Sequence, residues 1–227
     1  MKRITIQMIR LNKIVVIFLL LLVVNSTYAQ KIDRLFVNMP DEIIPTLTKN
    51  MRLELIEYFK VNKVDTIKDL FQNDAYMLRY DSVNQSVDLK ITPNATLSVK
   101  LFATKAKLDT ISYVVGVIQT VCGPVCSSQI NFYDKNWNKI KLNFVQPSAS
   151  DWLMDKSAEK EGIKIANVFK TSFVEFDFGS GMNELTLLNH SDELLTVEDK
   201  LFVKPYLKSD NKIYHIKATL NEINITQ

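Results

Sequence analysis

The stretch from Ile111 to Trp137 constrains the fold more than any other part of this sequence. It reads ISYVVGVIQTVCGPVCSSQINFYDKNW: a long apolar run, a tight turn between two cysteines, and a run in which apolar and polar residues alternate. Alternation with a period of two is typical of β-strands, and a strand that is apolar on both faces is covered on both sides. We therefore expect Ile111–Val121 to be a central strand that pairs with the run after Cys126.

Shorter alternating runs on both sides of this stretch predict an antiparallel meander. Short polar connections separate the runs, as expected for neighbouring strands joined by turns. The predicted strands are 76–80, 87–91, 97–101 and 140–144. One face of such a sheet is buried and the other faces water. The face exposed to water is expected to carry Asp88, Lys90, Ser98 and Lys100.

Two helices are predicted before the meander. Pro40 is followed by two acids, which suits the first turn of a helix, and we expect this helix to end near Leu47. The apolar residues Met51, Leu55 and Phe59 then recur at helical spacing and predict a second, amphipathic helix that lies on the core.

After the meander the chain repeats the order of helices and strands. The capping residues 148–151 predict a helix that runs to Gly162, and a short helical turn is expected at 163–169. The further strands are predicted at 174–178, 185–187, 201–207 and 213–220. The fold class is therefore α+β, with a single domain over 30–227. Its halves, 30–146 and 147–227, are interpreted as a diverged tandem duplication.

The first 29 residues have the order of a secretory signal peptide. An apolar run from Ile14 to Val24 follows four basic residues, and small residues stand at Thr27 and Ala29. Eleven helical residues, at about 1.5 Å each, reach only about half of the roughly 30 Å hydrocarbon core of a bilayer. We expect cleavage after Ala29, export to the periplasm or outer cell envelope of a Gram-negative bacterium, and no membrane span after cleavage.

Removal of this segment changes the charge of the protein. All four of its charged residues are basic, so 24 Lys and Arg remain against 25 Asp and Glu. The apparent basicity of the precursor thus belongs to its export signal. Because the remaining basic residues are scattered among acids, the sequence gives no indication of nucleic-acid binding.

The two cysteines, Cys122 and Cys126, are the first candidates for chemistry. The sequence Cys-Gly-Pro-Val-Cys is similar to the thioredoxin active site with one residue inserted. The redox motif needs two intervening residues at a helix N-terminus, which lowers the thiolate pKa, whereas here a strand pattern follows. A disulfide across a hairpin is the favoured interpretation, and so short a loop stabilises by about 2 kcal/mol. Free, redox-active thiols are the alternative.

No other motif predicts a catalytic residue, a cofactor or a metal. His190 and His215 have no metal-ligand spacing, and the glycine patterns of nucleotide-binding loops and of serine hydrolases are absent. Paired acids could in principle supply a general acid and base for sugar cleavage. Helix capping is the simpler interpretation of these pairs, which are Asp41-Glu42, Asp192-Glu193 and Glu198-Asp199.

Three short patterns are hypothetical modification sites. Each is Asp followed by Ser or Thr and then an apolar residue, which resembles the general O-glycosylation signal of Bacteroides-type bacteria. The acceptors would be Thr66, Ser82 and Thr110. Asp-Thr and Asp-Ser are also common in ordinary turns.

Several longer segments resemble a Bacteroidales family of exported proteins that is described as a domain of unknown function. The segments are FVNMPDEIIPTLTKNMRLELIEYF, VIQTVCGPVCSSQINFYDKNW and KLFVKPYLKSDNKIYHIK, and the Phe132-Tyr133-Asp134 turn with Trp137 is the most characteristic piece. The resemblance covers about Leu35 to Lys217. It implies export and a single domain, and it brings no activity or cofactor.

The leading functional hypothesis is a non-enzymatic module of the periplasm or cell envelope. It would bind an envelope protein or a glycan through its sheet or a sheet edge. The alternative is an envelope enzyme that uses the thiols of Cys122 and Cys126 or a pair of carboxylates.

Overall fold

The computed structural model describes residues 32–62, 65–104, 112–154, 162–179, 181, 183–208, 211–219 and 222–226. The predicted signal peptide, residues 1–29, lies outside the described residues. Thr110 and residues 155–161 of the helix predicted between 148 and 162 also lie outside them.

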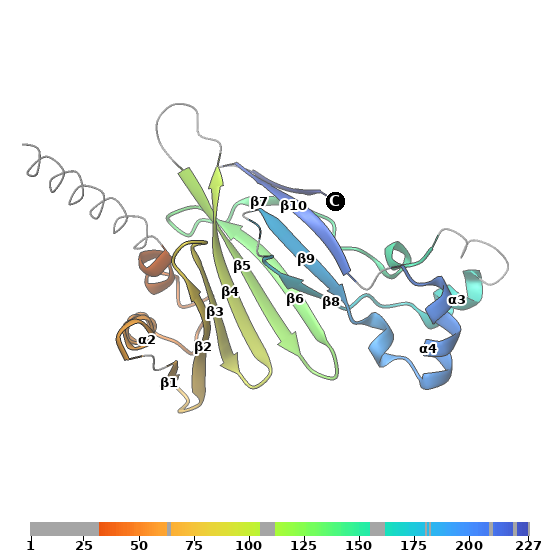
Figure 1. Cartoon of the computed structure of the whole chain (residues 1–227), viewed down its shortest axis with the longest axis horizontal. Coiled ribbons are helices and arrows are strands. Elements are labelled where there is room, and N and C mark those ends of the chain that lie inside the picture. Colours follow the sequence, from red (N-terminus) through yellow and green to blue (C-terminus); the bar gives the residue numbers. More distant parts are fainter. Residues whose placement is uncertain are drawn as a thin grey trace, which may run out of the picture.

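Sheet A is an antiparallel meander of six strands in the order β1-β2-β3-β4-β5-β6 (Figure 1). The predicted alternating runs are confirmed as strands, and β4 and β5 pair over ten residues, from Ala95↔Val121 to Thr104↔Ser112. The short first strand was not predicted from the sequence. The strands are β1 (Thr66–Lys68), β2 (Asp74–Asp81), β3 (Ser86–Thr92), β4 (Ala95–Thr104), β5 (Ser112–Cys122) and β6 (Cys126–Tyr133).

Sheet B has five strands in the order β7-β11-β10-β9-β8. Its neighbours are antiparallel except for β11 and β7, which run parallel. The strands are β7 (Lys141–Asn143), β8 (Val174–Asp177), β9 (Glu184–Asn189), β10 (Asn211–Ala218) and β11 (Glu222–Thr226). The two sheets have different strand orders, and the tandem duplication stays a prediction.

The expectation that residues 140–144 continue the meander was wrong. The chain returns to β6 only briefly, through the bridge Tyr133↔Lys139 and a bond of 2.8 Å from the Ile140 N–H to the Phe132 carbonyl. Ile140 then enters the core between the two sheets, and the chain continues into sheet B as β7. Both pairings fit the same alternating sequence, because period two fixes the faces of a strand and not its neighbour.

The fold is α+β as predicted, with two helical segments before the sheets and further helices after sheet A. Residues 32–37 are helical and α2 spans Lys49–Asn62. The later helical segments are η1 (Ala149–Trp152), α3 (Gly162–Val168), η3 (Ser191–Leu194), α4 (Val197–Val203) and η4 (Lys204–Tyr206). Among the helices of the described residues, none combines the length and the apolar character that crossing a bilayer requires.

Two predicted elements were assigned wrongly. Residues 41–47 form turns instead of a helix, because the buried guanidinium of Arg52 takes the carbonyls of Met39 and Leu47 as hydrogen-bond acceptors. Residues 201–206 are helical instead of extended. Thr196 caps this helix by accepting a bond of 3.1 Å from the Asp199 N–H, and the acids of the first turn favour it further.

Strand β5 contributes to two separate hydrophobic cores. Val115 and Val117 pack with the N-terminal helical segments on one face of sheet A, whereas Val114 and Ile118 face sheet B. Figure 1 shows α2 on one side of sheet A and sheet B on the other. β5 is therefore covered on both faces as predicted, although it lies next to the edge strand β6 instead of at the centre of the sheet.

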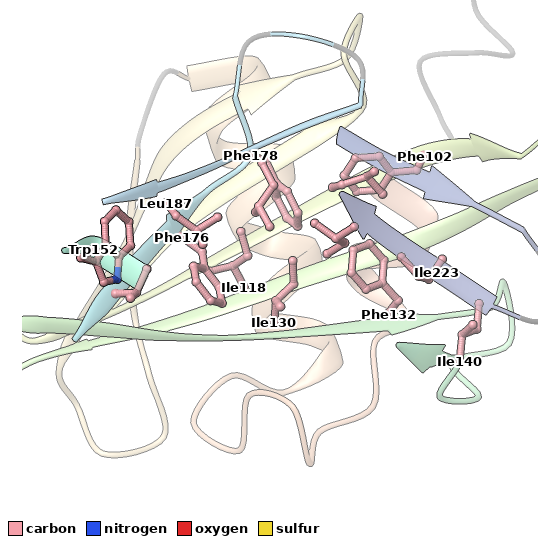
Figure 2. Close-up of a cluster of buried hydrophobic side chains, with 14 of the residues drawn as sticks. Phe102, Ile118, Ile130, Phe132, Ile140, Trp152, Phe176, Phe178, Leu187 and Ile223 are labelled. Carbon is pink, nitrogen blue, oxygen red and sulfur yellow. The ribbon is translucent and has the colours of Figure 1, made fainter. Parts of the chain in front are cut away.

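Gly116 of β5 lies beneath aromatic rings that come from both sheets. A Cβ atom at this position would be 2.7 Å from a ring carbon of Phe102 and 2.8 Å from one of Phe178. Figure 2 shows Phe102, Phe132 and Phe178 pointing into the space between the sheets. The ring centroids of Phe102 and Phe178 are 5.3 Å apart in an edge-on contact. Glycine at 116 thus leaves room for the aromatic contact that joins the sheets.

We predict that Gly116→Ala destabilises the protein by about 1–3 kcal/mol, because the rings cannot move without opening the core. Gly123→Ala is the matched control, since a Cβ at this hairpin tip meets nothing within 4 Å. Urea unfolding followed by tryptophan fluorescence measures both free energies of unfolding. Equal stability of the two variants would contradict this account of the interface.

Candidate binding site

Sheet B covers only part of one face of sheet A. The covered part is β4 to β6, where Phe102, Ile118 and Phe132 are buried against sheet B. Most side chains that point to the same side from β2, β3 and the start of β4 are partly or fully exposed, and we call this surface the open face. The open face consists of Tyr76, Leu78, Arg79, Asp88, Lys90, Thr96 and Ser98.

A groove of about 590 Å³ lies at one end of the open face. Its floor includes Tyr76 and Leu78 of β2, which are 36% and 56% exposed, and Lys90, which stands opposite Tyr76 on β3. The residues that line it are Asp65, Gln72, Asn73, Asp74, Tyr76, Leu78, Lys90 and Pro93. The groove therefore combines an aromatic ring and an aliphatic side chain with amides and both signs of charge.

A rigid loop between β1 and β2 borders the groove. The fully buried carboxylate of Asp69 accepts bonds of 2.8 Å from the N–H groups of Phe71 and Asn73. The Leu70 N–H donates to the Thr46 carbonyl at 3.0 Å, and Gln72 has a φ of 64°. This loop holds Phe71 out into solvent with 71% of its surface exposed. The adjacent Leu70 is 49% exposed, so the loop presents a pair of apolar side chains to water. Contiguous exposed apolar surface is typical of interaction sites.

Lys100 was expected on the exposed face, and this expectation was wrong. Only 3% of the residue is exposed, because the turn between β8 and β9 covers it. Its Nζ donates to the carbonyls of Gly179 and Gly181 at 2.9 and 2.8 Å. Burial, and then the positive charge of Arg79, lower the pKa of Lys100. The lysine thus holds the turn of sheet B against sheet A and closes one side of the open face.

A group of charged side chains follows along this boundary. Arg79 Nε donates to Asp88 Oδ2 at 2.5 Å across β2 and β3. Burial and the negative charge of Asp88 both raise the pKa of Asp177 at the end of β8. The open face therefore meets sheet B at a corner that carries alternating charges.

Strands β8 and β9 form a hairpin. At the end opposite its turn, His190 links two glutamates. Its Nε2 lies 2.9 Å from Glu175 Oε2, and its Nδ1 lies 2.7 Å from Glu193 Oε1. Burial, the largest single effect, lowers the pKa of His190, but the bonds to Glu193 and Glu175 together raise it above 6.5. In the sequence His190 has no metal-ligand spacing, and no local pattern predicted this pair of contacts.

We predict that His190 makes the stability of the protein depend on pH. Because the pKa of His190 is raised on folding, its contribution is fully present below about pH 6.5 and is lost as the pH rises through the folded-state pKa. The free energy of unfolding of His190→Gln should therefore fall furthest below that of the wild type near pH 5.5, with a smaller gap at pH 8. Urea unfolding between these pH values measures the gap, and a gap that does not change with pH would contradict the prediction.

The two cysteines lie at the tip of the β5–β6 hairpin. Cys122 is directly opposite Cys126, with the Sγ atoms 2.03 Å apart and the Cα atoms 4.0 Å apart. The strands continue on both sides of the pair, and no helix begins at either residue. The structure thus brings the sulfurs to disulfide distance, and formation of the bond in the cell stays a prediction.

The remaining predicted site residues have local roles. Asp41 lies 2.9 Å from Arg52 Nη1 instead of at a helix N-terminus. Asp192 pairs with Lys200 at 2.9 Å, and Asp199 lies in the first turn of α4. No group of three or more His, Cys, Asp or Glu side chains suited to a metal ion occurs among the described residues.

Two of the hypothetical glycosylation acceptors lie within the described residues. Thr66 stands in the edge strand β1 and its hydroxyl donates to Asp65 Oδ1 at 2.9 Å. Ser82 follows β2 in the turn before β3 and is partly exposed. Thr110 lies outside the described residues.

Fold and site together define an α+β protein built mostly from antiparallel strands, with an open sheet face beside a second sheet. The chain belongs to the family described as Protein of unknown function (DUF3256), whose model matches residues 24–219. The resemblance to a Bacteroidales family of unknown function is thereby confirmed.

A solved structure has a similar fold. It is described as the structure of a domain of an uncharacterized protein from Porphyromonas gingivalis W83, and it covers 86% of this chain and 98% of its own. The TM-score is 0.68 with 16% sequence identity, so this likeness concerns the fold alone. Comparison with curated proteins finds no match.

Proposed function

We propose that this protein is an exported, non-enzymatic module of the bacterial periplasm or cell envelope. It binds another envelope component, a protein or a glycan, through the groove on the open face. The observation that carries the proposal is the exposure of Tyr76 and Leu78 on the floor of this groove beside the rigidly held Phe71.

The chemistry of the groove supports recognition by contact and hydrogen bonding. The ring of Tyr76 offers an apolar surface with a polar hydroxyl, and the amides of Gln72 and Asn73 offer both donors and acceptors. Lys68 already pairs with Asp74 at 2.7 Å, so part of the charge at the rim is neutralised within the protein. A groove of this composition suits a ligand with both apolar and hydroxyl or amide groups.

We predict that the double variant Tyr76→Ala, Leu78→Ser loses an envelope component that the wild type retains. The two side chains supply the apolar floor of the groove, so their loss should reduce recovery at least tenfold, which corresponds to about 1.4 kcal/mol. Pull-down from the native envelope with quantitative mass spectrometry measures this recovery.

Val83→Ala is the control for this experiment. Val83 is an exposed apolar residue in the turn between β2 and β3 and does not line the groove. The control should retain the component. If the double variant recovers the same set of molecules as the control, the groove is not the binding site.

Intact mass of the protein recovered from its native host tests three further expectations together. We predict a chain that begins at Gln30 and lacks two hydrogen atoms because Cys122 and Cys126 are joined. Hexose added at Thr66, Ser82 or Thr110 would give discrete heavier species that each Ser or Thr to Ala substitution removes. A retained N-terminal segment contradicts cleavage, two alkylated thiols contradict the disulfide, and a mass without added hexose contradicts glycosylation.

A further inference from the structure

Strand β6 ends sheet A, and among the described residues its outer edge pairs only at its last two residues. The Ile140 N–H bonds to the Phe132 carbonyl, and Lys139 bridges to Tyr133. Within the described residues, no strand pairs with the outer edge of the preceding stretch, Cys126–Asn131. Strand β8 lies against its inner face, where the Phe176 N–H donates to Ser128 Oγ at 2.9 Å. Six residues are the usual length of a β-strand, so this edge can accept one.

The edge also lacks the features that normally protect a sheet from further pairing. Natural edge strands are short, bulged, or carry charges and proline. The eight residues of β6 are CSSQINFY, with no charge and no proline, and the pairing of β5 with β6 shows no register shift. The opposite edge differs, because β1 has only three residues and includes Lys68.

The chain opens a groove at the point where it leaves β6. After Ile140 the chain leaves sheet A and enters sheet B as β7. A groove of about 550 Å³ lies where the chain diverges from β6. Its walls are mostly apolar, and its lining residues are Asn131, Phe132, Lys139, Ile140, Lys141 and Leu142. A side chain from a strand added along β6 would point into this groove.

The charge around the groove is positive. Lys139 and Lys141 both line it and are exposed. Glu222 lies 3.9 Å from Lys141 and also accepts a hydrogen bond from Asn143. An approaching carboxylate would therefore meet two lysines that the described part of the protein neutralises only in part.

We propose that the edge of β6 over Cys126–Asn131 binds an extended segment of a partner polypeptide as a seventh strand of sheet A. The segment is uncharged along the edge and places an apolar side chain against Phe132 and Ile140. Acidic residues follow at its end and face Lys139 and Lys141. Backbone hydrogen bonds supply the affinity in this mode, and the groove and the lysines supply the selectivity.

This surface is separate from the groove on the open face, which lies at the β1–β3 side of the sheet. The two proposed binding sites can therefore be tested separately, and failure of one proposal does not affect the other.

Fluorescence anisotropy with labelled synthetic peptides tests the proposal on the whole mature chain. The probe alternates valine and threonine over six residues and ends in two glutamates. A second probe ends in two lysines, and a third repeats the first with alternate backbone nitrogens methylated, so that one edge of the peptide cannot donate hydrogen bonds. We expect the first probe to bind at least tenfold more tightly than the other two.

Charge-reversal variants test the lysines without touching the core. Lys139→Glu combined with Lys141→Glu should weaken binding of the first probe at least tenfold, whereas Lys49→Glu at the exposed start of α2 should not. Equal binding of the methylated probe, or no binding of any probe, overturns the proposal.

Two further measurements separate other occupants. A dimer in sedimentation velocity that competes with the probe assigns the edge to a second copy of this chain. Retention on vesicles of anionic lipid that the same lysine variants abolish, without peptide binding, assigns the surface to a membrane. Either result also overturns the proposal.

Discussion

Three phenylalanine rings pack over Gly116, and this contact holds sheet B on sheet A. Gly116 lies between Val115 and Val117 on β5, and both valines face the other core, beneath the N-terminal helical segments. One strand thus organises both hydrophobic layers, and its alternation decides which layer each side chain enters. Because sheet B rests on β4 to β6 only, the same contact also determines where the open face begins.

Two buried cations stabilise irregular backbone around this framework. Arg52, 1% exposed, donates to the carbonyls of Val37, Met39 and Leu47, and Lys100 donates to those of Gly179 and Gly181. Turns that lack regular pairing leave carbonyls that must find donors when they are buried. In both cases one long side chain satisfies several of these carbonyls, so a segment without secondary structure is fixed in place.

Local patterns in the sequence determine most of sheet A and little of the site. Period two located β2 to β6 closely, since neighbours in this sheet are also neighbours in the chain. Residues far away in sequence determine which sheet β7 joins and whether Lys100 is buried. Neither feature therefore has a local signal in the sequence. Tyr76 and Leu78 fitted the apolar alternation of a strand with one buried face, and no local signal indicated that the structure leaves both of them exposed. The one hint of a surface feature was Leu70-Phe71, an apolar pair inside a polar turn.

The position of β11 has a consequence for how the chain acquires its structure. β11 pairs with β10 on one side and with β7, far earlier in the chain, on the other. Sheet A is built from successive hairpins and can assemble from local contacts, whereas sheet B is incomplete until residues 222–226 insert between strands already made. Such long-range closure is entropically slow. Until it happens, the aromatic side of sheet A faces water, so the partly folded chain passes through a stage that is prone to aggregation.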